Sequence, residues 1–594
     1  MADALRHRGP DGEGTFESRD GRIQLGHRRL AILDTTPAGA QPMRLGDRYA
    51  LVFNGEIYNY IELRQVLEDS GHEFRSRTDT EVLLVALATW GEQALERLDG
   101  MFAFAFFDEE EGRLFCARDR FGEKPFFYRE TPGDGLIFAS EMKAIFAAGV
   151  PAEPDPRMLY FYLAYGALNE AAAPDRTFFR DIRSLPPGHL LTVERNGRVR
   201  TRRYYDLVSP REPREIEADV AARRIYELLE RSVTRRLRSD VPLGSSLSGG
   251  IDSTAIVSLI DRLADSDQPL RVFSARFNDP ERDEGPWIGK ALASVRAEPH
   301  ETRPTAVDLA DTLSHVFFHQ EEPFASASIL AQWKVMELAG KTGVTVLLDG
   351  QGADEIFAGY PPQYRSRLLE LYRTDRDLFA VERQAYEARH GRTWPLSFGM
   401  RFFADALSPG AVRLCGRVRR SLTTPGYMKV LAPEFAEEHR DAPPPFVTFR
   451  TLDDALRHRM TQQGLPALLR YADRNAMAFA REVRLPYLCH ELVEFAFSLP
   501  AGMKLREGWT KWILRRAVDG LIPREIAWRE DKLGYEPPQD DWLADPQIVE
   551  RTRAGRELLV GAGVLRDAEA GDAWPVLMAS ELFAFADKFA ESAE

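Results

Sequence analysis

The sequence predicts two folded domains in succession: an α+β domain over residues 1–208, then an α/β domain with a parallel sheet and a helical C-terminal layer over residues 215–594. The chain has 594 residues, whereas a single domain usually has roughly 100 to 200. The stretch Ser209-Pro210-Arg211-Glu212-Pro213-Arg214 is polar and proline-bearing, which indicates a linker. At that point the hydrophobic pattern also changes, which places a domain boundary near residue 210.

The first domain is expected to be rich in strands. Short apolar or alternating runs bounded by Gly, Asp and Pro predict strands at residues 49–53, 101–107, 113–117, 135–139 and 189–194. The dipeptide Asn196-Gly197 predicts a type I′ hairpin turn after the last of these strands. Helical spacing of apolar residues predicts helices at 59–70 and 79–98.

The second domain alternates between strand and helix. Strands are expected at residues 241–247, 271–277 and 344–349, and helices at 253–264 and 286–295. This alternation is typical of a parallel sheet with helices on both faces, which binds its ligands at the carboxyl ends of the strands. From about residue 365 onward helical patterns dominate, and we expect much of this stretch to form a layer over the ligand site.

Composition excludes several classes of function. The 78 Lys and Arg against 92 Asp and Glu give a net charge of −14, which disfavours nucleic acid and anionic membranes as partners. The longest uninterrupted apolar run, residues 101–107, is far shorter than the roughly 20 residues that span a bilayer. Cys116, Cys415 and Cys489 form no CxxC pair, so we expect a reducing compartment and a cytoplasmic protein.

A glycine-bearing loop is expected to bind the phosphates of a nucleotide. Ser248-Gly249-Gly250-Ile251-Asp252-Ser253 follows one predicted strand and opens a helix. Two glycines let the backbone approach an anion, the serine hydroxyls donate to it, and the helix N-terminus offers free N–H groups. Asp252 would repel phosphate, but it suits Mg²⁺, which is usually bound by one or two carboxylates together with substrate phosphates.

A second loop of the same kind occurs about a hundred residues later. Asp349-Gly350-Gln351-Gly352-Ala353-Asp354-Glu355 again follows an apolar strand and supplies a second carboxylate, Asp354. Asp252 and Asp354 are therefore the predicted Mg²⁺ ligands. Neither GxxxxGK[ST] nor GxGxxG is present, so Walker-type and dinucleotide sites are excluded. The SGGxDS loop resembles that of the ATP pyrophosphatases, which implies AMP and pyrophosphate as products.

The first domain contains a series of motifs in order. They are HRGPDG at 7–12, GHRRLAILD at 26–34, FNGEIYN at 53–59, RTDTE at 77–81, RDRFGEKP at 118–125 and SEMK at 140–143. Together with the second domain they resemble the asparagine synthase family over nearly the whole chain. The resemblance implies a class II glutamine amidotransferase of the N-terminal nucleophile fold (αββα), followed by an ATP pyrophosphatase domain.

The resemblance also implies roles for residues of the first domain. Arg29 can fork the carboxylate of glutamine, and Glu56 and Asp79 can hold its ammonium group. Asn54 and Gly55 resemble the oxyanion hole of the family, in which two donors face the charge that develops on the attacked carbonyl oxygen. The full predicted glutamine-binding set is Arg29, Leu30, Leu33, Asn54, Gly55, Glu56 and Asp79.

The nucleophile of the family is an N-terminal cysteine whose own α-amine activates its thiol. Here the sequence starts Met1-Ala2-Asp3-Ala4-Leu5, and its three cysteines are internal. Either a cysteine-led segment lies upstream of the written start, or the protein uses free ammonia. We favour the first, because Arg29, Asn54, Glu56 and Asp79 together would otherwise have no purpose. The chain as written is expected not to hydrolyse glutamine, and the missing first strand is expected to leave an open sheet edge.

Later motifs extend the resemblance into the second domain. Residues 471–478 and 482–486 resemble the DRxSMAxSxExRxPFLD signature of the family, although Cys489 replaces its final Asp. Lys511 matches a lysine near the phosphates, where a cation offsets the charge of leaving pyrophosphate. The predicted ATP-binding set is Ser246, Leu247, Ser248, Gly249, Gly250, Asp252, Ser253, Ala275, Asp349 and Gly350, and Lys511 and Gln351 are the predicted catalytic residues.

The second loop departs from the family pattern at Gln351. The family commonly has an acid there, which could take a proton from incoming ammonia, and Gln351 keeps only hydrogen bonding. L-Aspartate remains the favoured acceptor, giving L-asparagine with ATP, Mg²⁺ and glutamine-derived ammonia. A uronic acid or a biosynthetic intermediate is the rival acceptor. Three further alternatives are an ammonia-dependent enzyme, a ring-closing ligase, and a non-catalytic ATP-binding protein. Family analogy suggests a homodimer.

Overall fold

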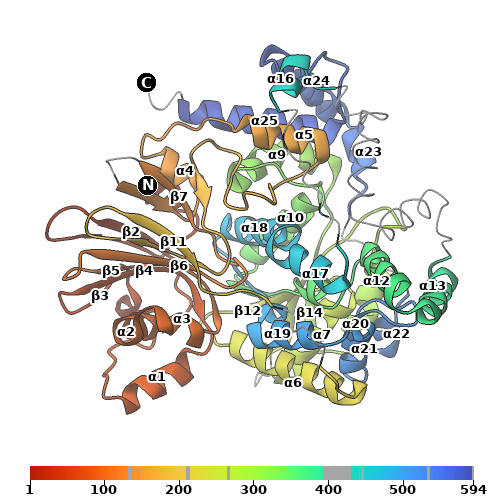
Figure 1. Ribbon diagram of the computed structural model, residues 1–594, viewed down its shortest axis with the longest axis horizontal. Coiled ribbons are helices and arrows are strands. Elements are labelled where there is room, and N and C mark those ends of the chain that lie inside the picture. Colours follow the sequence, from red (N-terminus) through yellow and green to blue (C-terminus); the bar gives the residue numbers. More distant parts are fainter. Residues whose placement is uncertain are drawn as a thin grey trace.

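The computed structural model describes residues 1–131, 135–208, 214–263, 268–391, 430–439, 442, 447, 449–530 and 536–590. The first third of the chain, red to orange in Figure 1, lies beside the rest, and the C-terminal helix extends along the top of both. Most of the predicted linker, residues 209–213, and Cys415 lie outside the described residues. The domain boundary near residue 210 stays a prediction.

Three antiparallel sheets build the first domain. The main one has six strands in the order β11-β10-β6-β5-β4-β3, and the smaller ones are β1-β2 and β8-β7-β9. All five predicted strands are confirmed. The strands are β1 (Gly12–Glu17), β2 (Gln24–Arg29), β3 (Met43–Leu45), β4 (Tyr49–Ile57), β5 (Gly100–Asp108), β6 (Arg113–Arg118), β7 (Phe127–Thr131), β8 (Gly135–Ala139), β9 (Arg183–Ser184), β10 (His189–Val193) and β11 (Val199–Arg203).

The helices of this domain include one that is shorter than the sequence predicts. The predicted helix at 79–98 ends at Trp90, because Gly91 has a φ of +56°, outside the helical region. A 3₁₀ turn and a short helix then complete the segment. The helices are α1 (Tyr60–Asp69), α2 (Asp79–Trp90), α3 (Ala94–Arg97), α4 (Met142–Phe146) and α5 (Pro156–Tyr165), with 3₁₀ turns η1 (Asp3–Leu5), η2 (Pro37–Gly39) and η3 (Gly91–Gln93).

The hairpin between β10 and β11 is present, but its predicted type is wrong. A type I′ turn needs positive φ at both central residues. Of the pair Asn196-Gly197, only Gly197 has a positive φ, at +80°. The Gly197 N–H donates to the Glu194 carbonyl and the Glu194 N–H donates to the Arg198 carbonyl. This is the longer connection, in which a turn is closed by one left-handed glycine that forms a bulge.

The second domain contains the predicted parallel sheet. Its strands are β12 (Leu243–Ser246), β13 (Leu270–Ala275), β14 (Ala297–Thr302), β15 (Val346–Leu348) and β16 (Glu482–Arg484). They are ordered β14-β13-β12-β15-β16, and every pairing is parallel. After β12 the chain adds β13 and β14 on one side of it, and then β15 on its other side. The crevice at that point, beyond the carboxyl ends of β12 and β15, is where such sheets bind ligands.

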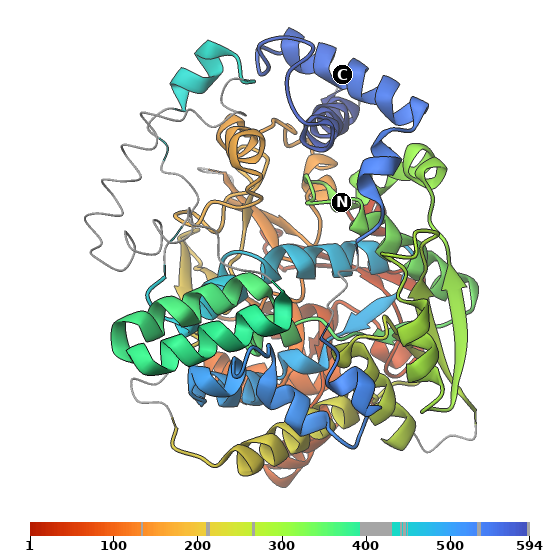
Figure 2. The ribbon, with the colours of Figure 1, turned by 90° about the vertical axis from the view of Figure 1, so that its right-hand side faces the viewer.

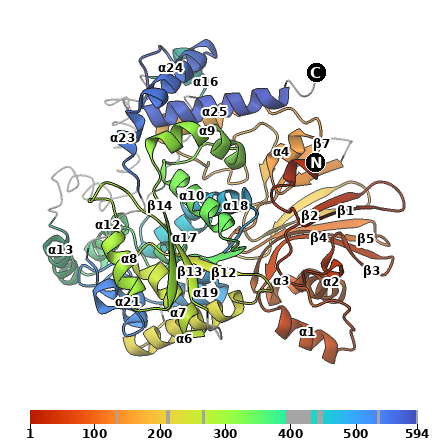
Figure 3. The ribbon, with the colours of Figure 1, turned by 180° about the vertical axis from the view of Figure 1, so that it is seen from behind.

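Helices cover both faces of this sheet, as predicted (Figure 3). On one face lie α6 (Ala218–Arg236), α7 (Ile251–Leu263) and α19 (His490–Ser498). On the other lie α9 (Ala306–Gln320), α10 (Ser328–Lys341) and α18 (Leu465–Met477). The helix α7 begins at Ile251, two residues before the predicted start, so Asp252 lies in its first turn.

The C-terminal helices only partly match the expected layer. The helices α12 (Pro361–Thr374) and α13 (Arg376–His390) pack together beside the site described below, whereas α24 (Pro546–Gly561) and α25 (Ala573–Ala590) lie away from it (Figure 2). The helix α25 packs on the first domain, where the ring of Phe589 lies 5.4 Å from that of Phe146. Part of the C-terminal stretch therefore forms the expected layer, and α24 and α25 lie outside it. The remaining elements are α8 (Gly285–Leu292), α11 (Ala353–Ile356), α16 (Pro433–Glu438), α17 (Leu452–Thr461), η5 (Pro486–Leu488), α20 (Ala501–Lys504), α21 (Trp512–Val518), α22 (Arg524–Ala527) and α23 (Gln539–Leu543).

Within the described part of the chain, no helix combines the length and the apolar composition that crossing a membrane requires.

Candidate active site

The two predicted nucleotide loops lie side by side in the fold. Residues 248–253 follow β12, and residues 349–355 follow β15, which pairs directly with β12. Two strands that are neighbours in a parallel sheet deliver their following loops to the same edge. The Cβ that would be added at Gly350 comes within 2.9 Å of the Asp252 Cβ, so glycine permits this close approach.

The first loop is held in shape by its own serines. The Ser248 N–H donates to the Ser253 Oγ at 3.2 Å, and the two hydroxyl oxygens lie 3.1 Å apart. Gly249 has a φ of +73°, and a Cβ there would lie 2.6 Å from the Ile288 backbone nitrogen. Glycine is thus required for both backbone conformation and space.

Asp252, Asp354 and Lys511 meet in one cluster. The Lys511 Nζ lies 2.5 Å from an Asp252 carboxylate oxygen and 2.7 Å from an Asp354 carboxylate oxygen. Burial opposes the charge of Lys511, but the two carboxylates outweigh it and raise its pKa. Two carboxylates that reach the same ammonium group are close enough to share one Mg²⁺ ion, so this donor set fits that metal.

A cleft of about 850 Å³ opens over these loops. A pocket of that size is typical of small-molecule sites. Its walls contain all but one of the predicted nucleotide and catalytic residues, namely Ser246, Leu247, Ser248, Gly250, Asp252, Ser253, Ala275, Asp349, Gly350, Gln351, Asp354 and Lys511. The exception is Gly249, which turns the loop without lining the cleft. The structure therefore brings these predicted residues together in one cleft, and their roles stay predictions.

Acidic side chains in the second loop have altered proton affinities. Burial raises the pKa of Asp349 to about 6, and the nearby charge of Asp252 adds to this effect. Burial and then the charge of Asp354 raise the pKa of Glu355, while the Tyr360 hydroxyl donates to its carboxylate at 2.7 Å. The Gln351 Oε1 is shielded from solvent and has no hydrogen-bond partner among the described residues. Gln351 lines the cleft together with Asp252 and Asp354, so its side chain offers a hydrogen-bond acceptor there.

Several cleft residues were not predicted. Tyr360 directly precedes α12, and Tyr386 and Arg389 lie in α13. They follow no phosphate-binding pattern, so sequence alone gave no signal. Arg515 lies one helical turn after Lys511, donates to the carbonyls of Thr510, Ala527 and Arg529, and lines the same wall. Because Arg515 lies in the same motif as Lys511, the sequence could have identified it as a candidate site residue.

In the first domain, the predicted glutamine-binding residues come from four segments. Arg29 ends β2, Leu30 and Leu33 follow it, Asn54, Gly55 and Glu56 lie in β4, and Asp79 begins α2. The Arg29 guanidinium donates to the carbonyls of Leu33, Asp34 and Thr36, so part of its donor capacity orders its own loop. The Asn54 Nδ2 donates weakly to the Ser140 Oγ at 3.4 Å. Gly55 has a φ of +149°, and a Cβ there would overlap the Met101 carbonyl.

The two acids of this set are buried and close enough to interact. The exposed fraction is 6% for Glu56 and 3% for Asp79. Burial, and then the charge of Asp79, raise the pKa of Glu56 well above its usual value. Burial also raises the pKa of Asp79 to about 6, although its carboxylate accepts from the Ile57 N–H at 2.8 Å. A bound ammonium group would relieve this concentration of buried negative charge.

The described cysteines are not reactive thiols. Cys116 in β6 and Cys489 before α19 are both buried, and burial raises the pKa of each. A raised pKa keeps the sulfur protonated and poorly nucleophilic.

Two family models match the two parts of the chain in this order. Residues 1–205 match a family described as glutamine amidotransferase domain, and residues 224–567 match the asparagine synthase family. The chain is 31% identical over 551 residues to "Asparagine synthetase [glutamine-hydrolyzing] 3" of Bacillus subtilis, covering 89% of this chain and 82% of that protein. "Amidase chry2" of Gibberella zeae is 26% identical, with 92% and 85% covered. A solved structure titled "Structure of the allosteric regulatory enzyme of purine biosynthesis" is 17% identical with a TM-score of 0.27, covering 50% of this chain and 76% of that one.

The fold and the matched regions together define a glutamine amidotransferase domain joined to an ATP-using, amide-forming domain. The chain belongs to the asparagine synthase family, and it is a carbon–nitrogen ligase of that type. The class of reaction in this family is glutamine-dependent amidation.

Proposed function

We propose that this protein activates a carboxylic acid as its adenylate and converts it to the amide, with L-aspartate as the favoured acceptor and L-asparagine as the product. The observation that carries the proposal is the meeting of Asp252, Asp354 and Lys511 at the carboxyl ends of β12 and β15, inside a cleft of about 850 Å³. This is the place where an α/β sheet binds nucleotides, and these are the groups that pyrophosphate and its metal need.

In the first step an oxygen of the acceptor carboxylate attacks the α-phosphorus of ATP. A P–O bond forms, the bond to the β,γ-pyrophosphate breaks, and the acyl adenylate remains. The loop at 248–253 supplies N–H and hydroxyl donors to the pyrophosphate from the start of α7. Mg²⁺, held by Asp252 and Asp354, would neutralise phosphate charge and orient it.

Lys511 acts on the leaving group. Its buried ammonium group lies between Asp252 and Asp354, and both carboxylates favour its charged form. A fixed cation at this position stabilises the negative charge that accumulates on pyrophosphate as it departs. Because that charge is greatest in the transition state, Lys511 contributes to the rate more than to ATP binding.

In the second step ammonia attacks the acyl carbon, and AMP leaves with the oxygen that came from the carboxylate. A proton must leave the attacking nitrogen. Gln351, whose buried Oε1 has no partner among the described residues, can accept a hydrogen bond from that nitrogen but cannot take its proton. The phosphate oxygens of the leaving AMP can receive it instead.

Glutamine is the proposed nitrogen source, bound by the set that contains Arg29, Asn54, Gly55, Glu56 and Asp79 in the first domain. We also propose that the protein works in the cytoplasm, and that it forms a homodimer by analogy with its family.

A different acceptor acid is the rival proposal. Gln351 favours a different acceptor. It stands beside the reacting carbon where the family commonly has an acid, and an uncharged side chain there changes which acids the cleft can bind. Relatives named as amidases also favour it.

Mass spectrometry of the products formed from Mg²⁺, ATP, ammonia and a panel of acids distinguishes the acceptors. The panel contains L-aspartate, L-glutamate, uronic acids and aromatic acids. Amidation of aspartate with release of AMP and pyrophosphate supports the first choice. Amidation of another acid while aspartate is unchanged would replace it with the rival.

A further inference from the structure

One arginine of the second domain reaches into the candidate glutamine pocket of the first. Arg484 ends β16, and its side chain has an exposed fraction of 0%. Its guanidinium Nη2 lies 3.3 Å from a carboxylate oxygen of Glu56. The two residues are 428 positions apart in the sequence, so only the docking of the domains brings them together.

The guanidinium of Arg484 is fixed on its other sides. Its Nε donates to a Glu482 carboxylate oxygen at 2.9 Å. Its Nη1 donates to the carbonyl oxygens of Arg236 and Arg238 at 2.8 and 2.7 Å. The planar fork of arginine suits this arrangement, because each nitrogen points in a set direction. The group facing Glu56 therefore has little freedom to move away.

Glu56 needs such a cation. It is buried, and the negative charges of Asp79 at the start of α2 and Glu482 in β16 both act on it. Of the cations, Arg484 lowers the pKa of Glu56 most, and Lys124 from the loop after β6 has a smaller effect. Burial and Asp79 still dominate and raise that pKa overall. Within the part of the chain that the structure describes, Arg484 makes the ion pair with Glu56.

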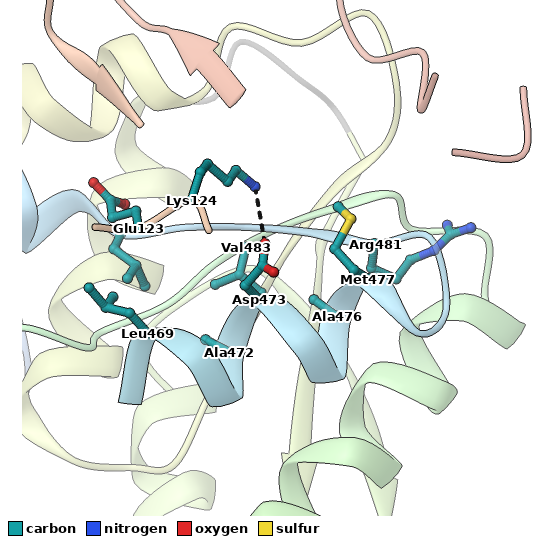
Figure 4. A pocket seen from close by; sticks show the side chains of 10 residues that line it. Glu123, Lys124, Leu469, Ala472, Asp473, Ala476, Met477, Arg481 and Val483 are labelled. Atoms are coloured by element: carbon teal, nitrogen blue, oxygen red, sulfur yellow. Dashed lines mark ion pairs between the residues drawn. The ribbon is translucent and has the colours of Figure 1, made fainter. Parts of the chain in front are cut away.

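The interface is also tightly packed on the other side of β16. A cavity of only about 10 Å³ lies there, where Glu123 and Lys124 of the first domain face α18 and β16 (Figure 4). It is lined by Val483 and Leu485, the chain neighbours of Arg484, because successive residues of a strand point to opposite faces. That volume admits roughly one water molecule.

We propose that Arg484 is a positioning residue of the glutamine pocket, which holds the Glu56 carboxylate in place as an anion from across the domain interface. This inference rests on the proposed function, in which Glu56 and Asp79 bind the ammonium group of glutamine. The pocket is then not complete within residues 1–208, because a residue of the second domain sets the charge of one of its ligands.

The backbone of Arg484 gives the test an internal control. Its carbonyl oxygen accepts from the Asp349 N–H at 3.0 Å, at the start of the second nucleotide loop. A side-chain substitution keeps this bond, so nucleotide affinity reports whether β15 and β16 are still correctly folded.

The experiment measures glutamine binding by calorimetry from pH 5.5 to 9, with the full chain. Binding, not hydrolysis, is the readout, so the nucleophile is not needed. R484M should weaken binding at pH 7.5 by roughly 30-fold or more. It should also shift the pH midpoint of binding upward by about one unit, since losing a cation raises the pKa of Glu56 further. R484K should shift it less, because one ammonium group cannot serve all four partners.

The matched control is R481M. Arg481 precedes β16, donates to the carbonyls of Phe479 and Val344, and makes no ion pair with Glu56 among the described residues. Its glutamine affinity and pH midpoint should equal those of wild type. For all three variants, Mg·ATP affinity is measured in parallel.

The outcomes distinguish an error in the glutamine pocket from an error in the role of Arg484. If wild type binds Mg·ATP but no glutamine, the glutamine pocket is wrong and this proposal falls with it. If wild type binds glutamine, and R484M keeps both the affinity and the pH midpoint, the pocket stands and the role of Arg484 is wrong. Should R484M also lose Mg·ATP binding, R484K decides, and a wild-type midpoint in that variant overturns the proposal.

Discussion

At the scale of single residues, the central feature is the buried ammonium group of Lys511 between two carboxylates. It lies 2.5 Å from Asp252 and 2.7 Å from Asp354 and has an exposed fraction of 3%. The sequence could predict that Lys511 belongs to the site, because it lies in a recognisable motif. It could not predict that the two loops and Lys511 converge on one point, since that depends on the order of the strands.

Replacing Lys511 with methionine should reduce kcat for acid-dependent pyrophosphate release by about 100-fold or more, with little change in the KM for ATP. The reason is that the lost charge acts mainly on the leaving group. Steady-state kinetics check this. K504M is the matched control: Lys504 is equally buried and pairs with Asp453 at 2.9 Å, but lies outside the cleft. It should lower stability and keep kcat. A K511M enzyme with a changed KM and an unchanged kcat would contradict this role.

The buried carboxyl group of Glu123 should make the free energy of unfolding depend on pH. Burial raises the pKa of its carboxyl group to about 8, and the Asp119 charge adds to this. Because the folded pKa exceeds the unfolded value, the stability it contributes is complete below about pH 4.5 and is lost as pH rises to about 8. E123Q should therefore match wild type near pH 4.5 and be more stable by roughly 2–5 kcal/mol above pH 8.

Chemical denaturation at several pH values measures this difference. The control is E130Q, which makes the same substitution at an exposed site. A difference between E123Q and wild type that does not change with pH would contradict the raised pKa of Glu123.

At the scale of elements, the sequence predicted strands and helices well where hydrophobic periodicity was strong. It failed where one residue interrupts a pattern, as at Gly91, which ends α2 at Trp90. It also missed β16, because three residues are too few to show a period. The contact between Arg484 and Glu56 could not be predicted either, since no local pattern relates residues so far apart.

The turn after β12 depends on one glycine. Gly249 has a φ of +73°, and a Cβ there would press on the backbone of Ile288 and Trp287. G249A should weaken Mg·ATP binding by about 10-fold, because a left-handed alanine costs roughly 1–2 kcal/mol and the loop must shift. Calorimetric titration with ATP measures the loss. G289A, in α8 where a Cβ meets nothing within 4 Å, should bind as wild type does. Equal affinities for both variants would contradict the proposed loop geometry.

At the scale of the whole molecule, buried ion pairs join the two domains. The Arg8 guanidinium lies 2.8 Å from Glu141 of the first domain and 2.8 Å from Asp473 of α18. Arg474 of α18 in turn pairs with Glu141 and Glu321. The helix α25 adds aromatic contacts to the first domain, with Phe585 lying 5.7 Å from Phe179. These contacts fix the two sites relative to one another.

Replacing Arg8 with methionine should lower the free energy of unfolding by roughly 3–5 kcal/mol, because Glu141 and Asp473 lose a shared buried partner. It should also separate thermal unfolding into two transitions, as the domains lose their connection. Differential scanning calorimetry detects both effects. Arg6 is exposed and lies two residues earlier, so R6M should unfold as wild type does. A single transition at the wild-type temperature for R8M would exclude this role of the interface.

In the proposed mechanism, the acceptor carboxylate is activated as an acyl adenylate in the cleft over β12 and β15. The most direct test uses aspartate labelled with ¹⁸O in its side-chain carboxylate, together with Mg·ATP and ammonia, and follows the label by mass spectrometry. We expect one ¹⁸O atom in the phosphate of AMP, because the bridging oxygen leaves with AMP when ammonia attacks. Label in inorganic phosphate with formation of ADP, or an amide formed without any label in AMP, would contradict it.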